Sequence, residues 1–263
     1  MRIISFCANG IEQAASRGFY EWLSQQDADV VCIQDIRAQE HLLKDDCFFP
    51  PEYNAYFFDN PESTNGVALY CRDTPKAIMT GLGFNMFDSD ARYIQADFDR
   101  ISFGSILAPE SFIDDPKSIK RKLNFFEQLY EHLAKIKNKR REFLISGNLF
   151  IAHQPRDLMN SKAHQGNIGF TDKEREWMDK IFIDLGYVDA FRSVISDDDE
   201  FTWWPSENFK KDAWRVDYQI ASQGLRKNVE YATILKTKFF SQHAPLIVDY
   251  DYEISVPSEM CYF

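Results

Sequence analysis

Apolar stretches rich in β-branched and aromatic residues recur along the chain and predict many strands. Apolar and polar positions alternate imperfectly within them, which is typical of strands that are largely buried on both faces. We expect strands at residues 2–9, 28–35, 54–58, 66–72, 93–99, 101–108, 142–148, 216–222 and 245–253.

Three stretches between these strands have helical patterns, at roughly residues 11–26, 117–137 and 172–185. The second stretch places apolar residues three or four apart, which forms one stripe along a helix: Leu123, Phe126, Leu129, Tyr130 and Leu133. The third follows Thr171, a good N-cap residue, has an acidic first turn and stops at Gly186.

The number and length of these elements indicate an α/β fold in one large domain. The chain has 263 residues, of which 44% are hydrophobic and 15% aromatic, so it can bury a large core. Two sheets packed face to face with helices outside would use the elements well. We expect a single domain over residues 1–263 with a short C-terminal tail at about 254–263.

Composition predicts a cytoplasmic protein. No apolar run approaches the roughly 18 residues of a membrane span, and the acidic Glu12 comes too early for a signal peptide. The five cysteines form no CxxC pair, and three lie within strand-like runs, as buried free thiols of a reducing compartment do.

The net charge of −11 limits how the chain could meet nucleic acid. Cationic surface displaces counterions from phosphates, so an acidic chain needs a local basic patch, a metal or a basic partner. The best patch for RNA or partner contact is KIKNKRR, with Lys135, Lys137, Lys139, Arg140 and Arg141. Helix-dipole compensation and solubility are the alternative role for this patch. Arg226 and Lys227 form a second candidate, or are simply exposed turn residues.

Nine short strings, in this order, resemble one known superfamily: RIISFCANG, VVCIQDIR, GVALYCR, RYIQADF, SGNLFIAH, GFTDKEREWMD, FTWWP, WRVDYQIAS and SQHAPLIVDY. The chain resembles the endonuclease/exonuclease/phosphatase superfamily, and within it the exodeoxyribonuclease III-type enzymes. The resemblance runs from residue 2 to about residue 250. It implies a four-layer α-β-β-α sandwich of two packed mixed sheets flanked by helices.

The resemblance also implies phosphodiester cleavage by a hard divalent metal held by oxygen ligands. Such enzymes carry an Asn in the first strand, a Gln-Glu pair ending the second and a Tyr before a Pro. They also carry a Gly-Asp-x-Asn motif, an Asp in an RxD strand and a closing Asp-His pair. In that pattern the Glu holds the metal, the Gly-Asp-x-Asn carboxylate handles the attacking water, and the closing Asp orients the His that stabilises the transition state.

Most of these positions differ in this chain. The altered positions are Cys7, Asp35, Leu107, Asn148, Phe150 and Gln242, whereas Asp217 and His243 are unchanged. With the water-activating acid and the His-orienting acid both lost, we expect no catalytic residues, no metal, no cofactor and no enzymatic activity.

Three alternatives bear on this expectation. Asp217 and His243 are either a surviving hydrolytic pair or, as we expect, hydrogen-bonded structural remnants, because neither has its acidic partner. Asp35 with Asp217 could still hold Mg²⁺ weakly. Trp203 and Trp204 could stack on bases, although packing is the commoner role of such residues.

The YVDAFR, FTWWP and FSQHAPLIVDYDY strings are similar to one group within the superfamily, the catabolite repression control proteins of pseudomonads and their relatives. The resemblance implies a non-enzymatic translational regulator that acts with the hexameric RNA chaperone Hfq on A-rich messenger RNA. The second hypothesis is a divalent-metal-dependent nuclease or phosphodiesterase with an altered site. The third is a scaffold that binds only proteins.

Overall fold

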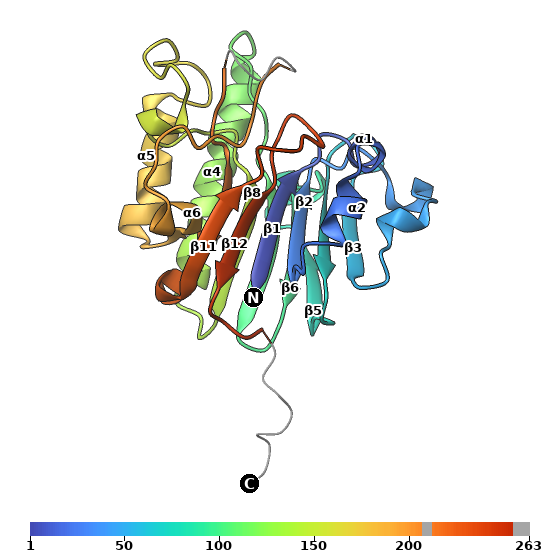
Figure 1. Cartoon of the computed structure of the whole chain (residues 1–263). Coiled ribbons are helices and arrows are strands. Elements are labelled where there is room, and N and C mark those ends of the chain that lie inside the picture. The colour runs from blue at the N-terminus through green and yellow to red at the C-terminus, as the bar shows by residue number, and fades with distance from the viewer. Residues whose placement is uncertain (207–211, 255–263) are drawn as a thin grey trace.

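The computed structural model describes residues 1–206 and 212–254. Two six-stranded sheets pack face to face, and helices lie outside them (Figure 1). The predicted four-layer α-β-β-α sandwich is therefore confirmed. No helix in the described part of the chain is long and apolar enough to cross a membrane.

The first sheet has the strand order β11-β12-β1-β2-β4-β3. Its strands are β1 (Arg2–Cys7), β2 (Val30–Gln34), β3 (Asn54–Asp59), β4 (Gly66–Cys71), β11 (Val229–Ile234) and β12 (Leu246–Tyr250). β1 lies inside this sheet, parallel to β2 and antiparallel to β12. The amine of Met1 donates to the carbonyl of Tyr250 at 2.7 Å, which ties the start of β1 to the end of β12.

The second sheet has the order β5-β6-β7-β8-β10-β9. Its strands are β5 (Ala77–Thr80), β6 (Tyr93–Asp97), β7 (Ile101–Leu107), β8 (Glu142–Asn148), β9 (Val188–Asp189) and β10 (Asp217–Ala221). Only the β7–β8 pairing is parallel among the pairings of these strands, so β7 and β8 end at the same edge.

The main core fills the space between the sheets with fully buried side chains, among them Ile3, Val30, Leu69, Phe103 and Leu144. One polar link crosses it, because Gln34 Nε2 donates to Ser105 Oγ at 2.9 Å. A buried amide needs such a partner, and this one also fixes where β2 lies against β7.

Helices α1 (Ile11–Ser16) and α2 (Phe19–Leu23) pack on the outer face of the first sheet. We expected a single helix over residues 11–26, and that prediction was wrong in detail. Gly18 has φ +85°, a left-handed conformation that interrupts the helix and that glycine adopts without strain. The short helices η1 (Glu40–Leu42) and η2 (Asp46–Phe48) follow β2.

Helices α4 (Pro116–Ile136) and α5 (Asp172–Asp179) cover the outer face of the second sheet (Figure 1). Phe126, Leu129 and Leu133 of the predicted stripe are buried, whereas Leu123 and Tyr130 are half-buried. Thr171 is the N-cap of α5, as predicted, and a π-helical segment η4 (Lys180–Asp184) continues the helix. The remaining short helices are α3 (Asn85–Asp88), η3 (Pro155–Asp157), α6 (Ala190–Val194) and η5 (Gln223–Asn228).

All nine predicted strands are present, with ends shifted by up to three residues, whereas β5, β9 and β11 were not predicted. β5 is mostly exposed and β9 has two residues, so neither carries a buried apolar pattern. Of the predicted tail at about 254–263, residues 255–263 lie outside the described residues.

Candidate active site

The site forms where strand ends from both sheets meet. Parallel pairing brings the ends of β1 and β2 together at Cys7 and Gln34, and the ends of β7 and β8 together at Leu107 and Asn148. The antiparallel strand β10 begins there, because Asp217 pairs with Asn148. The topology thus gathers residues from distant parts of the sequence at one edge of the sandwich.

The turn after β8 depends on a close approach of two main chains. A Cβ atom at Gly147 would lie 1.8 Å from the carbonyl oxygen of Ile106, so only glycine fits there. The next side chain, Asn148, is fully buried, and its Oδ1 accepts from the backbone N–H of Phe150 at 2.8 Å. Its Nδ2 donates to Cys7 Sγ at 3.6 Å. Asn148 therefore holds the turn and links β8 to β1.

The buried ion pair between Lys122 and Glu174 also stabilises the turn after β8. Lys122 Nζ donates to the carbonyl of Phe150 at 2.8 Å and to Glu174 Oε1 at 2.6 Å. Glu174 Oε2 in turn accepts from the N–H of Gly169 at 2.8 Å. Helices α4 and α5 thus fix the backbone position of Phe150.

Asp217 and His243 form a buried pair at this edge, since Asp217 Oδ2 lies 2.8 Å from His243 Nδ1. We expected His243 to lack an acidic partner because Gln242 replaces the closing Asp, and that prediction was wrong. The partner is Asp217 on β10, whereas Gln242 Oε1 accepts from Asn9 Nδ2 at 3.2 Å. His243 is therefore oriented by a carboxylate despite the change at position 242.

The charges around His243 favour its protonated form. Burial lowers the pKa of the imidazole, but the nearby Asp217 carboxylate and Cys7 outweigh burial and raise that pKa well above 6.5. Burial raises the pKa of the Cys7 thiol, and the neighbouring His243 opposes that rise.

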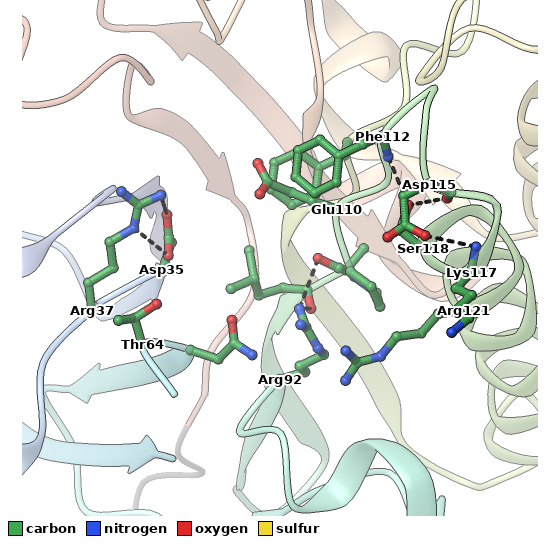
Figure 2. Close-up of a pocket in the computed structure, with 15 residues that line it drawn as sticks. Asp35, Arg37, Thr64, Arg92, Glu110, Phe112, Asp115, Lys117, Ser118 and Arg121 are labelled. Carbon is green, nitrogen blue, oxygen red and sulfur yellow. Dashed lines mark hydrogen bonds and ion pairs between the residues drawn. The ribbon is translucent and has the colours of Figure 1, made fainter. Parts of the chain in front are cut away.

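A cleft of about 570 Å³ opens beside these strand ends (Figure 2). Leu107 and Phe150 line it, together with Asp35 and Arg37 on one wall and residues of α4 such as Arg121 on the other (Figure 2). Asp35 Oδ2 pairs with Arg37 Nη2 at 2.9 Å, a contact that the sequence analysis missed although the two residues are only two apart. The cleft is polar and nearly balanced in charge.

The donor set does not fit the hard divalent cation that the superfamily resemblance implies. Mg²⁺ requires several oxygen ligands in near-octahedral geometry. Cys7 offers sulfur, Asn148 has its amide oxygen engaged with Phe150, and the Asp35 carboxylate is paired with Arg37. These residues therefore do not form a Mg²⁺ site.

Trp203 and Trp204, which could stack on bases or serve packing, have different surroundings. Trp204 is buried and packs edge-on against Phe239 at 5.3 Å between ring centres, consistent with the packing role that we favoured. Trp203 is half-buried and lies nearly parallel to the His243 ring, with the ring centres 6.1 Å apart.

The predicted basic residues lie in several places. Lys137, Lys139, Arg140 and Arg141 line a second pocket of about 500 Å³, joined by Arg100 from the β6–β7 turn. This pocket lies at the start of β8, and a seven-residue strand separates it from the cleft by roughly 20 Å. Lys135 lies apart from these residues, in another pocket that His132 also lines. Arg226 lines yet another pocket, and Lys227 is exposed on η5.

Comparison with known proteins identifies the family. The model of the Endonuclease/Exonuclease/phosphatase family matches residues 8–238. The chain belongs to this family. The fold agrees, because an AP endonuclease from Archaeoglobus fulgidus superimposes with a TM-score of 0.87 at 23% identity, covering 96% of this chain and 100% of that one. A 3′-5′ exonuclease from Neisseria meningitidis gives a TM-score of 0.86 at 19% identity, with the same coverage.

The curated relatives overturn our expectation that the chain is not an enzyme. An exodeoxyribonuclease of Bacillus subtilis (strain 168) is 28% identical over 252 residues, which cover 94% of this chain and 98% of that protein. The DNA repair nuclease APEX1 of Danio rerio is 27% identical over 253 residues, covering 94% and 81%. Both relatives align with almost the whole of this chain, and both are named as nucleases. This similarity indicates that the chain is a nuclease.

Proposed function

We propose that this chain is a hydrolase that cleaves phosphodiester bonds of nucleic acid at the cleft between the two sheets, with an altered active site. The observation that carries the proposal is the buried hydrogen bond between Asp217 and His243, 2.8 Å long, at the edge where five strand ends meet. The nuclease relatives support the same activity.

Asp217 and His243 supply the chemistry that we assign to the site. Asp217 holds Nδ1 of the imidazole and raises the pKa of His243, which favours the protonated ring, the form that can donate a proton or hydrogen bond to a phosphate oxygen. Such donation stabilises the charge that develops in phosphoryl transfer. Asn148 offers no group that could deprotonate a water molecule, so we expect slow turnover.

The experiment is a cleavage assay with purified protein. Duplex DNA with one abasic site and single-stranded DNA and RNA would each be incubated with Mg²⁺, Mn²⁺ or Zn²⁺, and products resolved on denaturing gels. We expect cleavage in at least one metal, reduced at least about 100-fold by His243→Asn.

The matched control is His153→Asn, because His153 forms a similar pair with Asp179 at 2.7 Å on the surface. It should leave the rate unchanged. Full-length substrate in every lane would reject the proposal, as would cleavage that survives in His243→Asn.

A second candidate function concerns the basic pocket at the start of β8. We propose that the pocket contacts A-rich messenger RNA presented by the RNA chaperone Hfq in the cytoplasm, the role that resemblance to catabolite repression control proteins implies. Its support is the pocket's charge: Arg100, Lys137, Lys139, Arg140 and Arg141 line it, against one acidic residue, Glu142. In a chain of net charge −11, such a surface can bind phosphates locally.

A gel mobility shift with an A-rich RNA already bound to Hfq tests this role. The protein should add a slower band, and the charge reversal Arg140→Glu with Lys139→Glu should abolish it. Arg17→Glu, on the exposed end of α1, is the control for lost positive charge. A slower band that persists in the double variant would reject the pocket as the contact.

A further inference from the structure

Three side chains that the strand ends bring together have the chemistry of a metal site different from the one expected for the family. Cys7, Asp217 and His243 are each buried, and their ligand atoms all lie within 4.8 Å of one another. They come from β1, β10 and the segment before β12, so the packing of both sheets creates the cluster.

The donor types select the metal. Thiolate sulfur and imidazole nitrogen favour borderline-soft ions such as Zn²⁺, whereas Mg²⁺ requires oxygen. Zinc bonds of about 2.0–2.3 Å in a tetrahedron place ligand atoms roughly 3.5 Å apart. A cluster already within 4.8 Å reaches that spacing by small side-chain adjustments.

A second observation points to a ligand at the same place. Asp217 Oδ1 is buried without a hydrogen-bond partner among the described residues, although Oδ2 of the same carboxylate is bonded to His243. A buried carboxylate oxygen without a partner destabilises the folded state unless something binds it. A cation beside Cys7 would satisfy it.

We propose that Cys7, Asp217 and His243 bind one Zn²⁺ ion. Cys7 coordinates as the thiolate and His243 as the neutral imidazole, so binding releases the proton of the thiol and the extra proton of the imidazolium to solvent. Three protein ligands leave a fourth position open, the arrangement of catalytic rather than structural zinc sites. The inference rests on the proposed hydrolase and changes its chemistry: with His243 as a ligand, the charge on the phosphate would be stabilised by Zn²⁺ as a Lewis acid and not by a protonated imidazole.

The cluster lies close to the cleft along the second sheet. Asn148 pairs with Asp217 on one side and with Leu107 on the other, and Leu107 lines the cleft. Phe150 also lines the cleft and is half-buried. One strand, β8, therefore lies between Leu107, at the cleft, and Asp217 of the cluster.

The test is metal binding by the full chain in the absence of nucleic acid. Protein stripped of metal with a chelator would be titrated with Co²⁺, followed by Zn²⁺ in competition. We expect one equivalent of Co²⁺ with an intense thiolate-to-cobalt charge-transfer band, and displacement of that band by Zn²⁺. Zn²⁺ should also raise the Tm, because it binds the folded state.

Variants separate this site from the other cysteines. Cys7→Ser should abolish the charge-transfer band and weaken Zn²⁺ binding at least about 100-fold. Cys47→Ser, at a half-buried cysteine outside the cluster, should change neither. Asp217→Asn keeps the size of the side chain, so it tests the site even if Cys7→Ser fails to fold. Retention of the band in Cys7→Ser, or Co²⁺ binding without the band, would overturn the proposal.

The metal titration and the cleavage assay can fail independently, so they test the zinc site and the hydrolase separately. One equivalent of Zn²⁺ bound through Cys7 without cleavage of any substrate would support the metal site and reject the hydrolase. Cleavage with Mg²⁺ by a protein that does not bind Co²⁺ through Cys7 would reject the zinc site and leave the hydrolase standing.

Discussion

Asp217 and His243 lie 26 residues apart in the sequence, yet their side chains meet in a buried hydrogen bond of 2.8 Å. The bond joins the first residue of β10 to the segment that precedes β12, and so it links the two sheets. Thr202 Oγ1 accepts from the backbone N–H of Asp217 at 3.2 Å, which fixes the strand end that carries the carboxylate.

The first prediction concerns this pair. Asp217→Asn should lower kcat for phosphodiester cleavage about 10²- to 10⁴-fold with little change in KM, because the amide cannot stabilise a protonated imidazole. Steady-state kinetics on the best substrate measures both constants. Asp179→Asn, which alters the surface partner of His153, should leave both unchanged. Equal losses in the two variants would argue for a general effect on folding.

The second prediction restores a carboxylate to the turn after β8. Asn148→Asp places an acid where the family motif has one, so cleavage should rise about 100-fold or more once a base can take a proton from water. Single-turnover rates measure the gain. The exposed Asn138→Asp is the control. A rate no higher than that of the unaltered protein would mean that water activation is not what limits this site.

The third prediction concerns the support of Phe150. Lys122→Met leaves Glu174 buried without its cation, which should lower the free energy of unfolding by about 3–5 kcal/mol. Urea denaturation measures the loss. Lys120→Met, at an exposed position of the same helix, should cost less than about 0.5 kcal/mol. If the two variants unfolded at the same urea concentration, the ion pair would not stabilise the turn.

The fourth prediction is a pH dependence from His132 on α4. Burial, with Lys139 and Lys135 nearby, lowers the pKa of His132 to about 4. His132 takes up a proton near pH 6.5 in the unfolded chain but only near pH 4 in the folded protein. The free energy of unfolding therefore falls as the pH drops from about 6.5 to about 4.

Between pH 7 and pH 5 this histidine should cost about 2 kcal/mol of unfolding free energy. His132→Gln should show that much less loss over the same range, measured by urea denaturation at each pH. His41→Gln, at an exposed histidine, should follow the unaltered protein. Parallel curves for all three proteins would contradict the assignment.

The strands and the order of motifs were predictable because each depends on a local pattern. β1, β2, β7 and β8 are apolar on both faces, and such runs are recognisable without knowing their neighbours. β11 was missed because it alternates only in part and carries exposed residues such as Glu230 and Tyr231.

The site was harder to predict because its contacts cross between the two sheets. The sequence places His243 beside Gln242, but only the packing of the two sheets brings Asp217, on β10, to its ring. The fit of Cys7 against Asn148 likewise joins residues 141 apart. The sequence alone showed which positions of the family motif are altered. It did not show which of the side chains at these positions contact one another.

The basic pocket shows the same limit. KIKNKRR was visible as a run of charge, but Arg100 and Tyr252 join it from distant segments. Lys135, within the same run, turns instead toward a different pocket with His132. Helical geometry separates residues that are adjacent in the sequence.

The inner position of β1 has a consequence for synthesis of the protein. Because β1 pairs with β12, from Arg2 opposite Asp249 to Ser5 opposite Leu246, a nascent chain on the ribosome carries β1 without that neighbour until almost 250 residues have been made. During that time the unpaired edge of β1 is open to other chains. Long-range pairing of this kind also slows folding. Truncation before residue 246 should therefore yield aggregation-prone protein rather than a smaller working unit.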